Sequence, residues 1–270
     1  MRTVPFTRNR ELVYGLLTRA KKFHAPISIV LKMDVGELLT SLEREHDEGR
    51  RISLLAYLVK ATSMLLEKHP RLNHHLFHGL VRKFEVDFEE VSCNLVILRR
   101  DPGGERIVLP VVMRDSNRRS LEEINQELLR YRRTPLAELA EIKAIQRAKE
   151  MPLVAMKYFS FKCRSDPRFY RRYFGTYGMS SVLHDSGGGR VALNQGRGVL
   201  SQAYANTGAA FLPTSVTEEP RVVGGEVRAC RMLTMTTMID HHLIDGHEAL
   251  FALEELVAVV EQGRLLLPAT

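Results

Sequence analysis

The sequence predicts a single mixed α/β domain. Segments with helical and with strand periodicity alternate along the chain, and few linkers separate them. The 270 residues, 44% of them hydrophobic, are enough for one large domain with a substantial core. We therefore expect residues 1–270 to form one domain.

The first quarter of the chain supplies both helices and a strand. Apolar spacing predicts a helix over residues 9–22, and alternation predicts a strand over residues 27–35. Two amphipathic helices follow, over residues 35–46 and 53–68. Ser53 lies where a hydroxyl would cap the second of these helices.

Three β-prone runs and a further helix come next. The runs cover residues 80–86, 92–98 and 107–112. The helix over residues 120–132 opens with the capping-box pattern Ser120-Leu121-Glu122-Glu123. Strands followed by a helix again favour a mixed domain.

Near the C-terminus, a β-prone run ends in an imidazole and a carboxylate four residues apart. The run leads into Asp240-His241-His242-Leu243-Ile244-Asp245-Gly246, and a helical apolar pattern follows. Histidine has an unperturbed pKa near ~6.5, which suits it to take a proton from a thiol or hydroxyl at neutral pH. This segment is therefore the first candidate for a catalytic site.

Cysteine usage and hydropathy argue against several classes of protein. Cys93, Cys163 and Cys230 lack the spacing of a zinc site or a disulfide framework, and Cys93 is expected to be buried in a strand. The N-terminus lacks the apolar core of a signal peptide, and no apolar run approaches the ~18 residues of a membrane span. We expect a cytoplasmic protein.

The net charge of +7 favours an arginine-rich surface or an anionic small substrate such as coenzyme A. The basic residues are spread along the chain without a nucleic-acid motif, so no nucleic-acid partner is expected. His69, His74, His75 and His78 lack accompanying metal-ligand spacing and are expected in turns or at the surface, with no metal. The glycine-rich residues 185–190 are interpreted as a hairpin loop.

The candidate segment resembles the motifs of two related families. It is similar to D-H-R-x-x-D-G of the acyltransferase component of 2-oxoacid dehydrogenase complexes and to H-H-x-x-x-D-G of chloramphenicol acetyltransferase. Both motifs align His241 and Asp245, so the resemblance selects His241 over His242, for which we expect a structural role. It implies an α/β chloramphenicol-acetyltransferase-like fold, a two-layer sandwich of mixed sheet and packed helices, and acyltransferase activity.

Further segments of the chain resemble the dehydrogenase family in the same order. Pro5-Phe6-Thr7-Arg8-Asn9-Arg10 is similar to P-L-S-R-x-R, and His69-Pro70-Arg71-Leu72-Asn73 contains the P-x-L-N segment that precedes a hairpin. The segment from Ile107 to Asp115 is similar to the L-V-V-P-V-I-R-D run. The resemblance therefore extends over most of the chain.

The resemblance also implies the roles of the site residues. Gly175-Thr176-Tyr177-Gly178-Met179-Ser180-Ser181 is similar to G-T-F-T-x-S-N-L-G, whose serine hydroxyl stabilises the oxyanion, so Ser180 is the expected donor. Ser181 is the alternative, because a shift of one residue changes the face of the strand and the asparagine after the serine is absent. Thr176 is the next candidate.

In the resembling families the aspartate of the motif pairs with an arginine. His241 would be the general base and Asp245 would orient the site, with Arg8 or Arg10 as the expected partner of Asp245.

Two features depart from the family pattern. The chain begins at the catalytic domain, so no lipoyl or subunit-binding domain is expected. Residues 142–174 form an apparent insertion rich in Met, Phe, Tyr and Arg. Three interpretations remain open for it: extra helices packed on the core, a lid over an acyl pocket, or a surface for a partner.

From these observations we expect an acyltransferase that uses a coenzyme A or carrier-bound thioester and has no tightly bound cofactor. The resemblance implies a homotrimer, or a higher assembly of trimers, in which His241 of one chain faces Ser180 of the next. A lipoyl domain or an acyl carrier protein would be the protein partner. The alternatives are a dihydrolipoyl acyltransferase that serves a separately encoded lipoyl domain, and a non-catalytic trimeric core or scaffold subunit.

Overall fold

The computed structural model of the protein describes residues 22–100, 106–181 and 207–266, together with the single positions Thr3, Tyr14 and Thr18. Nearly all of the predicted helix over residues 9–22, both candidate arginines Arg8 and Arg10, and the glycine-rich segment at 185–190 lie outside this part.

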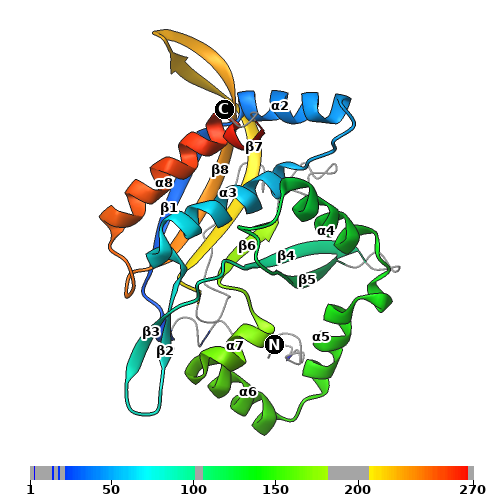
Figure 1. The fold of residues 1–270 in the computed structure, drawn as a ribbon, viewed down its shortest axis with the longest axis vertical. Coiled ribbons are helices and arrows are strands. Elements are labelled where there is room, and N and C mark those ends of the chain that lie inside the picture. Colours follow the sequence, from blue (N-terminus) through cyan, green and yellow to red (C-terminus); the bar gives the residue numbers. More distant parts are fainter. Residues whose placement is uncertain are drawn as a thin grey trace.

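One layer of the domain is a six-stranded mixed sheet (Figure 1). Its strands are β1 Pro26–Asp34, β4 Cys93–Arg100, β5 Arg106–Met113, β6 Tyr177–Ser181, β7 Ala209–Val223 and β8 Glu226–Asp240. They lie in the order β1-β8-β7-β6-β4-β5. Strand β6 pairs in parallel with both β4 and β7, and the other neighbours are antiparallel. The chain thus enters β6 only after a long excursion, because parallel neighbours need a crossover.

Helices form the second layer, on the side of the sheet that faces the viewer in Figure 1. They are α2 Gly36–Asp47, α3 Leu54–Lys68, α4 Leu121–Arg133 and α8 Gly246–Glu261. The main core lies between the layers, and Tyr177, Met179 and Phe211 contribute to it from the sheet. A separate buried cluster of Ala210, Leu212 and Met238 lies on the opposite face, as the alternation of strand side chains requires. The expected mixed sheet with packed helices is confirmed.

The helix boundaries follow the capping residues that the sequence contains. The Ser53 side chain accepts a hydrogen bond from the backbone N–H of Ala56 at the start of α3. At the start of α4, the backbone N–H of Glu123 donates to Ser120, and the backbone N–H of Ser120 donates to the Glu123 carboxylate. The predicted cap and capping box are both confirmed.

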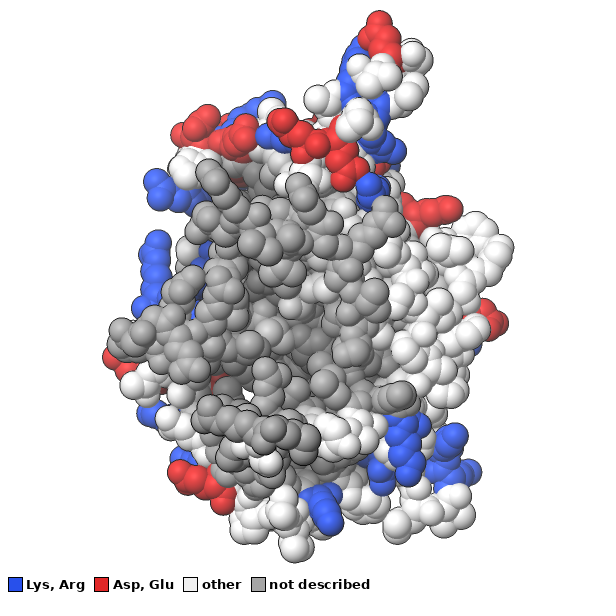
Figure 2. Space-filling model, turned by 180° about the vertical axis from the view of Figure 1, so that it is seen from behind, with Lys and Arg blue, Asp and Glu red and all other residues white. Residues whose placement is uncertain are grey.

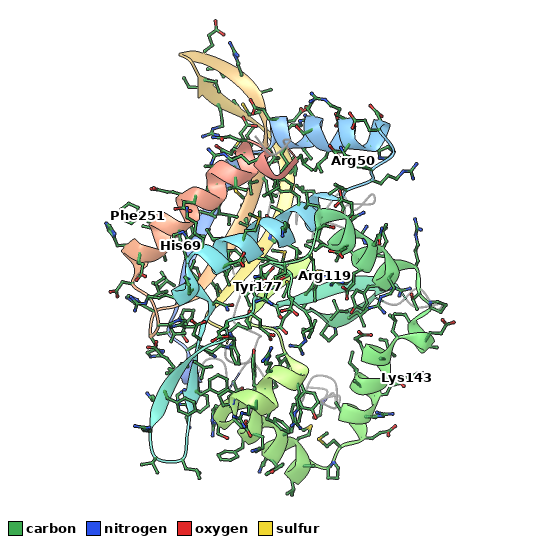
Figure 3. All side chains as sticks on the ribbon, in the orientation of Figure 1. Arg50, His69, Arg119, Lys143, Tyr177 and Phe251 are labelled. Atoms are coloured by element: carbon green, nitrogen blue, oxygen red, sulfur yellow. The ribbon has the colours of Figure 1, made fainter. Side chains whose placement is uncertain are left out.

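Between the layers, Tyr177 of β6 connects the sheet to α3 (Figure 3). Its hydroxyl lies 2.9 Å from Ser63 Oγ and 3.2 Å from Thr62 Oγ1, both on α3. The ring is fully buried. A buried polar group needs such partners, so this contact fixes one face of β6.

A second core lies away from the main one, below the sheet in Figure 1. Strands β2 His74–His78 and β3 Lys83–Asp87 form a hairpin, and α5 Ala140–Glu150, α6 Leu153–Ser165 and α7 Pro167–Tyr173 follow β5 and α4. Aromatic and sulfur side chains gather between the hairpin and the last two of these helices: Phe77, Phe88, Cys163 and Tyr170. Among the three interpretations of residues 142–174, that of extra packed helices fits α6 and α7, which pack in this second core.

The expectation that the clustered histidines lie in turns or at the surface is wrong for His75. This residue is fully buried in β2, and its ring lies 5.4 Å from the ring of Tyr170 and 4.9 Å from that of Phe88. Alternation along β2 turns His75 and Phe77 toward the same side, beneath α7. Residue periodicity did not reveal β2, because most of its residues are histidines, which are not β-prone. The hairpin that β2 forms with β3 lies where the family resemblance of residues 69–73 implied one.

Charged side chains are distributed around the molecule. On the described part of the face in Figure 2, Lys and Arg are interspersed with Asp and Glu around the rim. Among the described residues, no group of three or more His, Cys, Asp or Glu side chains could hold a metal ion. None of the helices in the described ranges is long and apolar enough to cross a membrane. Cys93 is buried as predicted, and burial raises the pKa of its thiol to about 12.

Candidate active site

The backbone of His241 is fixed where β8 gives way to α8. The His241 N–H donates to the carbonyl oxygen of Ala25 at 2.8 Å, so the residue is tied to the segment that enters β1. A turn follows, in which Leu243 N–H donates to Asp240 O at 3.0 Å. The predicted strand, histidine and helix therefore occur in that order.

The His241 side chain has a defined tautomer. Its Nδ1 lies 3.1 Å from the carbonyl oxygen of Ile244. A carbonyl oxygen can only accept, so in the neutral imidazole Nδ1 carries the hydrogen and Nε2 carries the lone pair. The side chain is 51% exposed in the single chain. Nε2 is therefore the proton acceptor that the ring presents.

Asp245 lies further from the imidazole than a hydrogen bond allows. Its Oδ1 is 3.9 Å from Nδ1 of His241, and its side chain is 87% exposed. It occupies the N-cap position of α8 without a side-chain capping bond. In the described part of the chain, the contact that orients His241 is the one to Ile244 O. The expected arginine partner of Asp245 lies outside the described residues, and the role of Asp245 stays a prediction.

Ser180 is placed by the alternation of β6. Tyr177 and Met179 point into the main core, so Ser180 points to the opposite face of the sheet. That is also the face of Met238 and, two residues later, of Asp240, which immediately precedes His241. Ser180 is partly buried. The serine thus faces the side of the sheet from which the histidine segment continues.

The sheet register nevertheless keeps Ser180 and His241 apart within one chain. Gly178 lies opposite Ala210, which lies opposite Met238, so Ser180 is level with the region of Thr236. It is thus two strands away from β8 and about four residues back from its end. His241 lies five residues beyond Thr236, so at ~3.3 Å per residue along a strand and ~4.8 Å between strands the separation is on the order of 20 Å.

Side chains from several elements hold the three residues that lead into β6. We call this set the β6 clamp: His75, Asn94, Arg114 and Tyr170. Together they bind every carbonyl oxygen from residue 174 to residue 176, with Arg114 on Phe174 O at 2.8 Å, Asn94 and Tyr170 on Gly175 O at 3.0 and 3.2 Å, and His75 on Thr176 O at 2.5 Å. Asn94 also accepts from Gly175 N–H at 2.6 Å. The start of β6 is therefore fixed from both sides.

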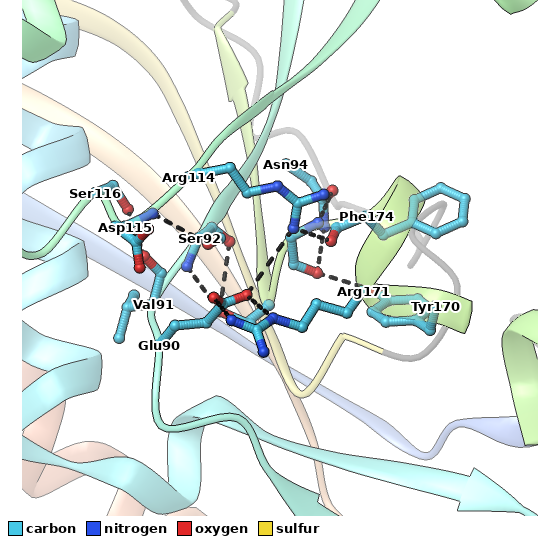
Figure 4. A network of polar contacts seen from close by, with 12 residues as sticks. Glu90, Val91, Ser92, Asn94, Arg114, Asp115, Ser116, Tyr170, Arg171 and Phe174 are labelled. Carbon is cyan, nitrogen blue, oxygen red and sulfur yellow. Dashed lines mark hydrogen bonds and ion pairs between the residues drawn. The ribbon is translucent and has the colours of Figure 1, made fainter. Parts of the chain in front are cut away.

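An ion pair between the buried Glu90 and the exposed Arg171 of α7 extends the β6 clamp toward that helix (Figure 4). Arg171 donates two hydrogen bonds to the Glu90 carboxylate, one of them at 2.7 Å from Nε. Arg114 Nη1 lies 4.0 Å from the same carboxylate. Burial lowers the pKa of Arg114, and the nearby Glu90 carboxylate counteracts that shift. The helices of residues 142–174 are thereby connected to the strand that carries Ser180.

Thr176 is less available as an oxyanion donor than Ser180. Its side chain is buried, its Oγ1 accepts from Ser92 N–H at 3.0 Å, and it also lies 3.4 Å from Ser92 O. Those contacts occupy the hydroxyl, so Ser180 remains the better placed of the two.

Sequence reasoning missed two residues beside His241. Asp240 is completely buried, and its carboxylate accepts hydrogen bonds from His24 and from the backbone of Ala25. A carboxylate that ends an apolar strand run is the signal that could have singled out Asp240. His24 is 216 residues away in the sequence, and its position in the chain carries no comparable signal.

Comparisons with known proteins agree with the sequence resemblance. The family model described as 2-oxoacid dehydrogenases acyltransferase (catalytic domain) matches residues 1–148, more than half of the chain. Ser180, His241 and Asp245 lie beyond the matched residues.

A curated relative is the dihydrolipoyllysine-residue succinyltransferase component of the mitochondrial 2-oxoglutarate dehydrogenase complex of Bos taurus. It is 31% identical over 265 residues, which cover 96% of this chain and 49% of the relative. The chain thus spans about half the length of that protein.

Solved structures share the fold. The dihydrolipoamide acetyltransferase of Azotobacter vinelandii aligns with a TM-score of 0.66 at 21% identity, over 99% of this chain and 94% of its own. The cubic core of a pyruvate dehydrogenase multienzyme complex aligns with a TM-score of 0.67 at 20% identity, with the same coverage. These alignments confirm the expected fold. The family match over more than half of the chain shows that it belongs to the catalytic-domain family of the 2-oxoacid dehydrogenase acyltransferases.

Proposed function

We propose that the protein transfers an acyl group between a coenzyme A thioester and a thiol acceptor, with His241 as the general base. The observation that carries this proposal is the bond from His241 Nδ1 to Ile244 O, which leaves the Nε2 lone pair on a half-exposed ring. An imidazole held in that tautomer can accept a proton from a thiol at neutral pH.

The chemistry requires two groups from this chain. Nε2 of His241 takes the thiol proton, and the thiolate sulfur forms a bond to the thioester carbonyl carbon while the carbonyl electrons move to oxygen. The Ser180 hydroxyl donates to that oxyanion. When the carbonyl re-forms, the bond to the coenzyme A sulfur breaks, and the departing thiolate takes the proton from Nε2. Losing one such oxyanion donor typically lowers kcat by ~10²–10³.

Relatives support the choice of residues and acceptor. The Azotobacter vinelandii enzyme was investigated for the roles of a serine, a histidine and an asparagine in its catalytic mechanism, the last two four positions apart. We assign the corresponding places to Ser180, His241 and Asp245. The bovine relative acts on a dihydrolipoyllysine residue, so a dihydrolipoyl thiol on a carrier domain is the acceptor that we propose.

An assay with two acceptors tests the reaction. The purified protein is incubated with acetyl- or succinyl-coenzyme A and, in separate reactions, with free dihydrolipoamide or with a hydroxyl acceptor. Release of coenzyme A and formation of the acylated product are both followed. Turnover with dihydrolipoamide supports the proposal. Turnover only with a hydroxyl acceptor would instead indicate a free-standing acyltransferase, and no turnover with either would favour the scaffold subunit.

We further propose that the site is completed between subunits of a trimer. The separation on the order of 20 Å between Ser180 and His241 within one chain is too large for both to act on one carbonyl. A cubic core formed by one of the structural relatives supports an assembly of this kind. Mass-resolved light scattering tests it, and an active monomer of 30.8 kDa would contradict it.

A further inference from the structure

Asp240 is a carboxylate placed where water cannot reach it. It is the last residue of β8 and is 0% exposed. Its oxygens accept from His24 Nδ1 at 2.6 Å, from Ala25 N–H and His242 N–H at 3.1 Å each, and from His242 Nδ1 at 3.0 Å. A buried charge requires this degree of compensation.

His24 is the most deeply buried side-chain partner of that carboxylate. Its side chain is 4% exposed, whereas that of His242 is 44% exposed. Burial alone would raise the pKa of Asp240, but the hydrogen bond and charge of His24, with the N–H groups of Ala25 and His242, hold that pKa below its usual value. Asp240 is therefore ionised at neutral pH.

The same contacts reach the backbone of His241. Ala25 follows His24, and while its N–H binds Asp240, its carbonyl oxygen accepts from His241 N–H at 2.8 Å. The segment before β1 and the end of β8 are thus joined through both backbone groups of one residue, Ala25. Moving His24 away from Asp240 would move Ala25, and with it the atom that holds His241.

We propose that His24 and Asp240 are positioning residues for His241, holding its backbone so that Nδ1 reaches Ile244 O and Nε2 faces the substrate. This proposal rests on the proposed function of His241. Neither residue touches substrate in it, and they act only through the placement of the imidazole. A misplacement of about 1 Å in an active site can lower the rate by ~10²-fold.

Two variants of His24 separate placement from simple packing. His24→Leu removes the donor, and we expect kcat to fall by ~10- to 100-fold with KM nearly unchanged. His24→Asn keeps an N–H donor near the position of Nδ1, and we expect it to restore most of kcat. His69→Gln is the matched control: it removes another histidine that pairs with a carboxylate, Glu255 at 3.2 Å, and should leave kcat unchanged.

A spectroscopic readout tests placement without substrate. In protein labelled with ¹⁵N at histidine, the His241 signals are assigned by their loss in His241→Ala. We expect the Nδ1–H tautomer in the wild type and in His24→Asn, and a mixture of both tautomers in His24→Leu.

The outcomes are separable. A folded His24→Leu protein with wild-type kcat and an unchanged His241 tautomer would overturn the inference. Where His24→Leu does not fold, Asp240→Asn takes its place, because it keeps the side-chain shape and removes the charge; wild-type kcat in that variant would likewise overturn it. Full activity in His241→Ala would refute the proposed function instead, and the tautomer in His24→Leu would still decide whether His24 positions the ring.

Discussion

The loop that carries His241 and the strand that carries Ser180 are held in place in different ways. The loop is held chiefly at one buried carboxylate, Asp240, with backbone bonds from His241 to Ala25 and from Leu243 to Asp240 and one bond from Arg71 to Leu243 O. The entry to β6 depends on the four side chains of the β6 clamp and on a core tyrosine, Tyr177. The loop, held chiefly at one carboxylate, and the β6 clamp, held by many side chains, should respond differently to substitution. Changes at the loop should act on rate, and changes at the β6 clamp should act first on stability.

Apart from His241 itself, the largest effect is expected for Ser180→Ala. We expect kcat to fall by ~10²–10³ with little change in KM, because the hydroxyl acts on the oxyanion and not on the ground-state carbonyl. Steady-state kinetics at equal folded fraction measures this.

Ser181→Ala is the control for that variant and should have a mild effect. The reverse pattern would show that the assignment along β6 is wrong by one residue. Equal, small effects would assign the oxyanion donor to another residue.

Gly175→Ala tests the β6 clamp. A Cβ at residue 175 would lie closer than 3.0 Å to the carbonyl carbon and oxygen of Ser92, so the backbone must shift. Overpacking of this kind typically costs about 1–3 kcal/mol of the free energy of unfolding. Urea denaturation measures the loss.

Gly246→Ala is the matched control for that clash. The nearest atom to its added Cβ is Ile27 Cδ1 at 3.7 Å, an ordinary contact, and the residue lies in the first turn of α8. Its stability should be equal to or above that of the wild type. Equal stability of Gly175→Ala and the wild type would contradict a rigid entry to β6.

His75 makes the β6 clamp sensitive to acid. Burial lowers the pKa of His75 to about 3, although the bond to Thr176 O favours the protonated form. The unfolded chain binds a proton near pH ~6.5 and the folded chain does not, so stability is lost as the pH falls from about 6.5 toward 3. At pH 5 this loss is about 2 kcal/mol relative to neutral pH.

His75→Gln isolates that contribution, because the amide keeps a donor for Thr176 O and does not titrate. Urea denaturation between pH 5 and 8 should show a smaller dependence on pH in the variant. An identical pH dependence in both proteins would mean that His75 is not the group responsible.

The smallest effect is expected for Asp245→Asn. The carboxylate is 3.9 Å from His241 Nδ1 and largely exposed, so its charge contributes little to the orientation of the ring. We expect kcat to stay within about threefold of the wild type. A tenfold loss or more would show that Asp245 acts through an ion pair that the assembled protein provides.

Much of the fold could be predicted because its signals are local. The caps at Ser53 and Ser120 and the strand-to-helix change around His241 each lie within a few adjacent residues. The partnership of His24 with Asp240 joins positions 216 residues apart, and no local pattern encodes it. Burial of His75 depends likewise on aromatic side chains of distant helices. The sequence therefore singled out the residue that we propose as the general base, and it gave no sign of the residues that we propose position it.

The most direct test of the acyltransferase assignment is the rate of acyl transfer in His241→Ala. Single turnover from acyl-coenzyme A to dihydrolipoamide is compared between the wild type, His241→Ala and the control variant His69→Gln, at equal folded fraction and equal oligomeric state. Loss of the general base should lower the rate by ~10²–10⁴ in His241→Ala and leave His69→Gln unchanged. Equal rates in all three proteins would contradict the assignment of His241 as the base.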